Sequence, residues 1–424
     1  MFKVLRNAWA VPDIRKKILF TLFMLLIYRL GSHIPVPFLD PTMMARFVEG
    51  SAGNGLFGLV DSFTGGAFSQ ATIFAMGITP YINSSIILQL LTIAIPALER
   101  MAKEGPEGRK KITSITRYTT IGLALIQAIA ICVTLNNWGL TQGHSFLNYA
   151  IIVIALTAGT TFIMWLGEQI TDKGIGNGIS LIIFASIVSR IPSMIHTIYA
   201  TFLGAKFSMI NLLWLVLLVA LVLAMLVFVV IMNNAERRIP VQYSKRVVGR
   251  KVYGGQSTHI PIKVALAGVI PIIFASSITM FPSTIAGLFG ANTSTGFWAV
   301  VAPGGWVYSV IYFLLIIAFT FFYTQIQFNP IEMANNMKMN GGFVPGIRPG
   351  RPTSDYISRV LNKITLAGAI FLGIIAIVPM LFSQLLPNMI IGGTSLLIVE
   401  GVALETVRAL ESQMMMRHYK GFLE

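Results

Sequence analysis

Apolar runs recur along this chain, and they constrain its fold more than any other feature of the sequence. Each run has about 18–24 residues, which is long enough to cross a hydrocarbon core about 30 Å thick. Of the 424 residues, 55% are hydrophobic and only 11% are charged, whereas about a quarter of the residues in an ordinary soluble protein are charged. The sequence therefore predicts an all-α polytopic membrane protein.

Ten transmembrane helices can be placed on these apolar runs. Their expected ranges are 18–34, 71–94, 115–135, 149–170, 174–196, 209–232, 263–286, 305–327, 364–383 and 393–411. The first run carries Arg29 and ends at a break with two prolines instead of a small-residue cleavage site. We therefore expect a retained helix there and not a signal peptide.

Lysine and arginine predict the orientation of the spans. If there are ten spans, the basic clusters at both termini and in the connections after the second, sixth and eighth spans all fall on one side. The opposite connections 136–148, 287–304 and 384–392 contain no Lys or Arg. The exceptions on that side are Arg29, Arg46, Arg190 and Lys206. Because cytoplasmic loops collect positive charge, both termini are expected in the cytoplasm, and topology accounts for most of the net charge of +15.

The expected spans divide into two halves of five, and the second half would be inverted relative to the first. Inverted repeats place a transport pathway at the interface between the halves. The expected organisation is a cytoplasmic N-terminal segment at 1–17, a first half at 18–199, a hinge connection at 200–208, a second half at 209–411 and a cytoplasmic tail at 412–424. The second half contains two long cytoplasmic loops, 233–262 and 328–363.

Motifs for enzymatic chemistry are missing from the sequence. There is no G-x-x-x-x-G-K-[ST] sequence for ATP, and the glycine-rich run 174–178 joins two apolar helices instead of a strand and a helix. The five histidines are scattered, so we expect no catalytic residue, no metal and no cofactor. The single cysteine, Cys132, lies in an apolar run and is expected to be a packing residue.

Two functional classes fit this topology, an apolar conducting pathway and a secondary transporter for a small solute. Transporters usually need buried ionisable groups for coupling, and Glu400 is the main such group inside an expected span. This scarcity favours an apolar pathway, with the transporter as the alternative. The two long basic loops predict a docking surface for an acidic partner, either an RNA backbone or the acidic face of a protein.

The segment 54–70 lies between the first two spans and is too short to cross a bilayer. Gly65 and Gly66 would let it hinge against the next helix. Its composition fits either an interfacial loop helix or a short re-entrant helix that fills a cavity.

Several motifs resemble the SecY family, the bacterial protein-conducting channels. The matching segments occur in the family's order at 73–82, 167–171, 174–179, 256–259, 273–277, 343–350 and 392–398. The C-terminal segment 417–422 resembles Gram-positive members. The resemblance implies an hourglass-shaped channel between two five-helix halves.

The resemblance also implies a ring of aliphatic side chains at the waist of this channel. By motif, the ring consists of Ile78, Ile82, Ile179, Ile183, Ile273 and Ile398. A narrow aliphatic ring dewets and blocks ions, yet it makes no specific bonds and can yield to many sequences.

Two mobile parts are implied as well, a plug beneath the ring and a lateral gate toward lipid. The plug would consist of Leu56, Phe57, Gly58, Leu59, Val60, Asp61, Ser62, Phe63 and Thr64. Asn83 and Phe281 fall on lateral-gate positions, between which a signal sequence would insert.

The family's partners account for the long basic loops. Docking of the ribosome and the SecA motor ATPase is expected at Lys245, Arg246, Arg250, Lys251, Arg348 and Arg351. The resemblance further implies the small subunits SecE and SecG, secretory preproteins with their signal sequences, membrane lipid, no direct DNA binding, and a bacterial plasma-membrane location. Glu400 departs from the family, since an aliphatic residue is expected there. Glu400 lies two positions after Ile398, which corresponds to about 200° around a helix, so Glu400 should face away from the pore.

Overall fold

The computed structural model describes residues 6, 8–50, 61, 63–141, 145–200, 202, 209–243, 246–248, 251–253, 257–288, 305–385 and 393–420. The chain forms two compact units, each composed of separate stretches of sequence. Unit 1 comprises Met1–Val216, Ser276–Val310 and Val378–Glu424, and unit 2 comprises Leu217–Ala275 and Ile311–Ile377.

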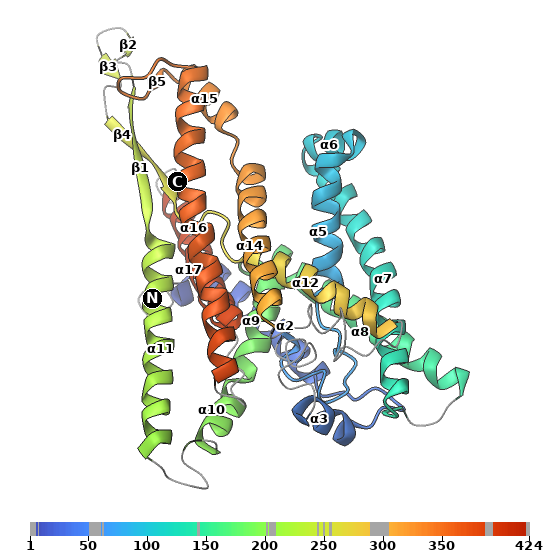
Figure 1. Ribbon diagram of the computed structural model, residues 1–424. Coiled ribbons are helices and arrows are strands. Elements are labelled where there is room, and N and C mark those ends of the chain that lie inside the picture. The colour runs from blue at the N-terminus through green and yellow to red at the C-terminus, as the bar shows by residue number, and fades with distance from the viewer. Residues whose placement is uncertain are drawn as a thin grey trace. The chain divides into compact units, whose positions relative to one another are not determined.

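Unit 1 is built from helices (Figure 1). Those that lie wholly within it are α2 (Pro12–Gly31), α3 (Pro41–Gly50), α5 (Thr79–Ala94), α6 (Pro96–Lys103), α7 (Pro106–Asn137), α8 (Phe146–Lys173), α9 (Gly178–Ser189), α10 (Ile191–Tyr199) and α17 (Gly393–Lys420). Helix α7 packs against both α5 and α8, while α9 packs against both α8 and α17. Four further helices contribute residues to both units, namely α11 (Met209–Asn234), α12 (Ile270–Leu288), α14 (Trp306–Gln327) and α16 (Arg351–Leu385).

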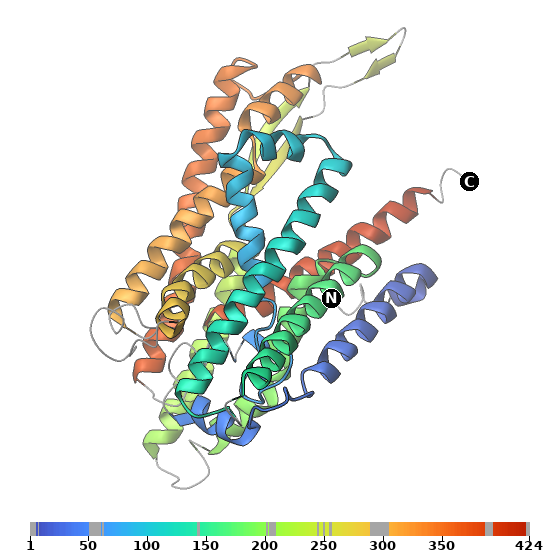
Figure 2. The same cartoon turned by 90° about the vertical axis from the view of Figure 1, so that its right-hand side faces the viewer.

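The helices of the described residues confirm a polytopic membrane protein. Six helical stretches of these residues are long and apolar enough to cross a membrane, among them Gly178–Tyr199, which joins α9 and α10, and Trp306–Met339. Helices α5 and α6 meet the same criteria only as a pair, which is bent by 101° at a break at Ile95, and Figure 2 shows α6 turning away from the end of α5. Pro96 at the start of α6 sets this break because the residue before a proline is disfavoured in the helical region. The expected total of ten spans stays a prediction.

Two expected spans become helical later than predicted. The run 71–94 becomes helical only at Thr79. Before it, the Ala71 carbonyl accepts a hydrogen bond from the Val36 amide at 2.8 Å, and Gly77 has a φ of +56°. The run 263–286 becomes helical only at Ile270, because residues 264–269 form turns. The expected span 174–196 is confirmed as a helix of spanning length at Gly178–Tyr199, in which α9 passes into α10 at Arg190.

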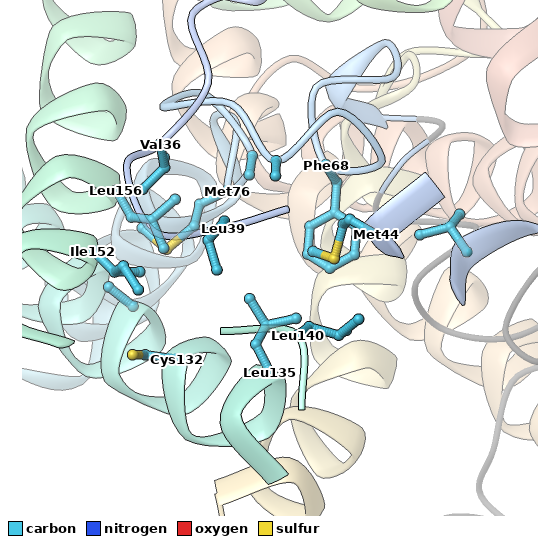
Figure 3. Packing of buried hydrophobic residues seen from close by; sticks show 14 of the residues in the cluster. Val36, Leu39, Met44, Phe68, Met76, Cys132, Leu135, Leu140, Ile152 and Leu156 are labelled. Atoms are coloured by element: carbon cyan, nitrogen blue, oxygen red, sulfur yellow. The ribbon is translucent and has the colours of Figure 1, made fainter. Parts of the chain in front are cut away.

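A buried apolar cluster holds the N-terminal part of unit 1 together (Figure 3). It joins α3, α7 and α8 to the irregular segments on either side of α3, with Phe68 and Met76 from the second of these segments. Cys132 is buried in this cluster and is a free thiol, so the expectation that it is a packing residue is confirmed.

In unit 2, described parts of the two expected long loops form strands and a short helix. A three-stranded sheet has the order β4-β1-β5, formed by β1 (Glu236–Tyr243), β4 (Ser257–Lys263) and β5 (Gly342–Phe343). Strand β1 pairs antiparallel with both neighbours, with Ile239 opposite Ile260 and Gln242 opposite Phe343. The sheet packs on α15 (Pro330–Met339) and α16 through a buried cluster that includes Val241, Met337 and Ile357.

Candidate functional site

The start of α9 places two of the predicted ring residues, Ile179 and Ile183. Asn177 caps this helix, and its side-chain oxygen accepts hydrogen bonds from the amides of Ile179 at 3.1 Å and Ser180 at 3.4 Å. An asparagine cap satisfies amides that a helix start leaves without partners. Ile179 is half-buried and Ile183 is buried.

The turn before α9 is held by a close approach between α8 and α9. A Cβ added at Gly178 would lie 2.0 Å from the carbonyl oxygen of Gly167, so only glycine fits. The Thr171 hydroxyl accepts a hydrogen bond from the Gly178 amide at 2.9 Å, and the Thr21 hydroxyl of α2 accepts one from Ile175 at 3.2 Å. The glycine-rich segment therefore allows the start of α9 to pack closely against α8.

Three helices of unit 1 carry predicted ring residues near their N-terminal ends. Ile78 is the N-cap residue of α5, and its carbonyl accepts the Ile82 amide at 3.1 Å, so both lie on the first turn. Helix α17, which carries Ile398, packs against α9, which carries Ile183. Ile78, Ile183 and Ile398 are 7%, 4% and 1% exposed. These three side chains are therefore buried within unit 1.

The remaining ring residue and the gate residues lie on other elements. Ile273 is a half-buried residue of α12 in unit 2. Asn83 is half-buried in α5, and its neighbour Ser84 ties α5 to α7 through a 3.0 Å hydrogen bond to the Thr116 carbonyl. Phe281 lies in α12, but its side chain is outside the described part of the structure.

An ion pair joins α7 to α8 near this point. Arg117 Nε lies 2.8 Å from Glu168 Oε1, and the glutamate side chain is only 12% exposed. Each residue therefore has a partner of opposite charge, so this pair adds no uncompensated charge to unit 1.

The plug prediction is described only at its C-terminal end. Asp61, Phe63 and Thr64 belong to the described residues, whereas 56–60 and Ser62 lie outside them. The Asp61 carboxylate is 1% exposed and lies 2.6 Å from Arg190 Nη1. This buried contact had no counterpart in the sequence reasoning.

The predicted docking residues belong to unit 2, where β1 brings both basic loops into one sheet. Arg348 is exposed, and its backbone is fixed by a 2.8 Å hydrogen bond from the Thr353 hydroxyl to its carbonyl. Gly346 and Gly350 flank it with φ values of +80° and +102°, in the left-handed region that glycine tolerates. The turn therefore holds an arginine outward, and Arg351 is exposed at the start of α16.

Two of the other predicted docking residues, Arg246 and Lys251, lie in a hairpin formed by β2 (Arg246–Val248) and β3 (Lys251–Tyr253), visible as a separate ribbon in Figure 2. Val248 stands opposite Lys251. The side chains of Arg246 and Lys251, and all of Lys245 and Arg250, lie outside the described part of the structure.

Sequence reasoning missed the hydrogen bond from Arg29 to the Gly65 carbonyl and the ion pair of Arg190 with Asp61. In the sequence, both arginines are exceptions to the charge asymmetry between the two sides. That anomaly was the available signal, because an arginine that topology does not require often serves a local contact. In the described ranges, no three His, Cys, Asp or Glu side chains cluster in a way that could hold a metal ion.

Apolar helices of membrane-spanning length define this chain as a polytopic membrane protein. A family model described as SecY matches residues 72–407. The chain belongs to the SecY family.

Curated relatives match over the full length of the chain. The protein translocase subunit SecY of Halalkalibacterium halodurans is 47% identical over 435 residues, covering 100% of both chains. The protein of the same description from Bacillus subtilis is 47% identical over 437 residues, again covering 100% of both.

Solved structures share the fold. A protein-conducting channel matches with a TM-score of 0.64 and 18% identity, covering 94% of this chain and 92% of that one. Sec61 in the canine ribosome-channel complex from the endoplasmic reticulum matches with a TM-score of 0.59 and 16% identity, with the same coverage. The helical channel fold expected from the sequence is confirmed.

Proposed function

We propose that this chain is the channel subunit of a bacterial protein translocase. It passes unfolded secretory polypeptides across the plasma membrane and releases hydrophobic segments sideways into lipid. The observation that carries the proposal is full-length similarity, at 47% identity, to proteins described as translocase subunits. A secondary transporter for a small solute is the alternative.

The six isoleucines form the proposed constriction. The burial of Ile78, Ile183 and Ile398, and the packing of α17 on α9, support this role within unit 1. Aliphatic side chains in a narrow passage exclude water and ions without binding a particular sequence. Residues 56–64 are the proposed plug, and Asn83 and Phe281 the proposed lateral gate.

The partitioning of a polypeptide segment into lipid would decide whether it leaves the channel sideways or crosses the membrane. An apolar segment gains a few tenths of a kcal/mol for each Leu or Ile that enters lipid, whereas an Asp, Lys or Arg at its centre costs about 2.5–3.5 kcal/mol. A sideways opening therefore sorts membrane segments from secreted ones without a specific binding pocket.

Energy would come from a partner, since the sequence has no ATP-binding motif and we do not propose an enzyme. The ordered turn that holds Arg348 outward supports a docking role for the basic surface of unit 2. The proposed partners are SecA, the ribosome, and the subunits SecE and SecG. The proposed topology has both termini in the cytoplasm and two inverted halves at 18–199 and 209–411.

A crosslinking experiment tests the conducting path. Cys132→Ala removes the native thiol, and Ile183→Cys then places the only cysteine at the proposed constriction. A secretory precursor with its own cysteine is stalled part-way in the assembled complex. Ile154→Cys is the matched control, since this isoleucine of α8 is 65% exposed.

A precursor-dependent disulfide at position 183, missing at position 154, is the expected result. If no adduct forms at any of the six isoleucine positions although the precursor is engaged, the proposed path is wrong and the transporter alternative regains weight.

A further inference from the structure

The carboxylate of Asp61 is buried and fully paired within unit 1. Its Oδ2 lies 2.6 Å from Arg190 Nη1, and its Oδ1 accepts a hydrogen bond from the Ser69 amide at 2.8 Å. The aspartate side chain is 1% exposed and the arginine side chain 27%. A buried carboxylate without such partners would be strongly unfavourable, so these contacts fix where this part of the chain can lie.

A second arginine holds the turn that follows Asp61. Arg29 Nη1 donates to the Gly65 carbonyl at 3.4 Å and to the Ser189 hydroxyl at 3.2 Å. Gly65 has a φ of +69°, and a Cβ added there would lie 2.7 Å from the Ser186 carbonyl oxygen. The turn is therefore pressed against the backbone of α9.

The third contact joins α2 to α9 directly beside this turn. The Tyr28 hydroxyl hydrogen-bonds the Ser186 hydroxyl at 2.7 Å, and it also donates to the Thr64 carbonyl at 3.4 Å. All of these side chains are buried or half-buried. Helices α2 and α9 thus both contact the turn that contains Thr64 and Gly65.

The two arginines are unusual for the side of the membrane on which they are proposed to lie. That side is nearly free of Lys and Arg in the sequence, so orientation does not require them. Arg46, a third exception, is exposed on α3 and belongs to none of the ion pairs found among the described residues. Arg29 and Arg190 therefore differ from Arg46 in that both bind the same short turn.

We propose that Asp61 and Arg190, supported by Arg29, are positioning residues that set the resting seal of the channel. The inference rests on the proposed function, in which residues up to Thr64 belong to the plug. Because the ion pair fixes Asp61 beside Arg190 at the end of α9, it holds the described C-terminal end of that segment in its resting position. Loss of the pair would shift the channel toward its conducting state.

The test uses the assembled complex in planar bilayers and in proteoliposomes. Asp61→Asn keeps the shape and one acceptor but removes the charge, and Arg190→Gln removes the other charge. The double variant closes a mutant cycle, Arg190→Lys preserves the charge alone, and Arg46→Gln is the matched control. Conductance is expressed per assembled complex, so that reduced assembly does not count as sealing.

Each single variant is expected to raise resting ion conductance at least about tenfold, which corresponds to about 1.4 kcal/mol in the closed-to-open equilibrium. The double variant should leak no more than the worse single variant, and Arg190→Lys should leak less than Arg190→Gln. Precursors with defective signal sequences should be accepted more often, while normal precursors still pass. A merely structural role would instead lower assembly and reduce transport of both precursors.

Two internal standards separate this inference from the proposed function. The wild-type chain must transport a normal precursor, and Ile183→Ser must leak ions. If either fails, the proposed function falls and the inference with it. If both hold but Asp61→Asn and Arg190→Gln seal as well as Arg46→Gln, or their effects simply add, the inference alone is overturned.

Discussion

Replacing Gly178 by alanine tests whether the contact between α8 and α9 sets the position of the proposed constriction. The added Cβ would lie 2.0 Å from the Gly167 carbonyl oxygen and 2.7 Å from Ile170 Cβ. A carbon and a carbonyl oxygen approach to no less than about 3.3 Å, so the start of α9 must move by about 1.3 Å. Both Ile179 and Ile183 lie on the next turn and move with it.

The cost follows from the same geometry. Forcing an extra carbon into a packed interior costs about 1–3 kcal/mol, and losing the hydrogen bond from the Gly178 amide to Thr171 adds about 1 kcal/mol. The expected loss is about 2–4 kcal/mol, visible as a lower unfolding temperature of the purified complex. Resting ion conductance in planar bilayers should rise because the ring residues of α9 are displaced.

A matched substitution elsewhere isolates the steric term. Gly122→Ala changes the same atoms on α7, where no atom lies within 4 Å of an added Cβ. This change should be neutral or stabilising by about 0.5–1 kcal/mol, since alanine favours helix over glycine. If Gly178→Ala is as stable and as tightly sealed as Gly122→Ala, the close approach does not position α9.

Three more substitutions and one change of pH test other parts of the molecule. Ile398→Asn should raise resting ion conductance, because a polar side chain wets an aliphatic constriction. Arg348→Glu should stop motor-driven export without reducing assembly, since this side chain is exposed. Glu400→Val should raise the free energy of unfolding by about 1–3 kcal/mol, because both carboxylate oxygens are buried without a partner. Hydrogen bonds from Thr42 lower the pKa of Asp40, so protection of α3 from hydrogen exchange should be present above the usual aspartate pKa and lost as pH falls through the lowered value.

Exposed positions provide the controls for the three substitutions. Ile154→Asn on α8 should not raise conductance, Arg359→Glu on α16 should not stop export, and Glu405→Val on α17 should not stabilise. The pH effect should disappear in Asp40→Asn. Equal behaviour of a test variant and its control would refute the corresponding prediction.

The physical demands of lipid explain which helices could be predicted from the sequence and which segment could not. Hydropathy placed most of the helices, because a chain in lipid must satisfy its backbone within helices and can expose only apolar side chains. It failed at 71–78, which is as apolar as a helix but is held in turns by Gly77 and by pairing with the segment that contains Val36. Hydropathy measures partition into lipid and does not report a backbone partner supplied by the protein itself.

The two long basic loops contain regular structure that the sequence reasoning did not place. Strand β1 pairs with β4 from the same loop and with β5 from a loop about a hundred residues later. Alternation at Ile239 and Val241, which are buried between exposed neighbours, was a local signal for β1. The pairing with Phe343 was not predictable locally, since a two-residue strand has no periodicity of its own.

The positions of Lys and Arg indicate local contacts as well as the orientation of the spans. Counting Lys and Arg by side predicts orientation because each charge near a cytoplasmic end is worth little individually and much collectively. A charge on the opposite side works against that bias, so its presence calls for a compensating contact. Arg29 and Arg190 each have one, both to the same turn, whereas Arg46 remains exposed. Exceptions to the positive-inside pattern are therefore the place to look for buried ion pairs, provided that an acidic residue such as Asp61 lies in a nearby connection.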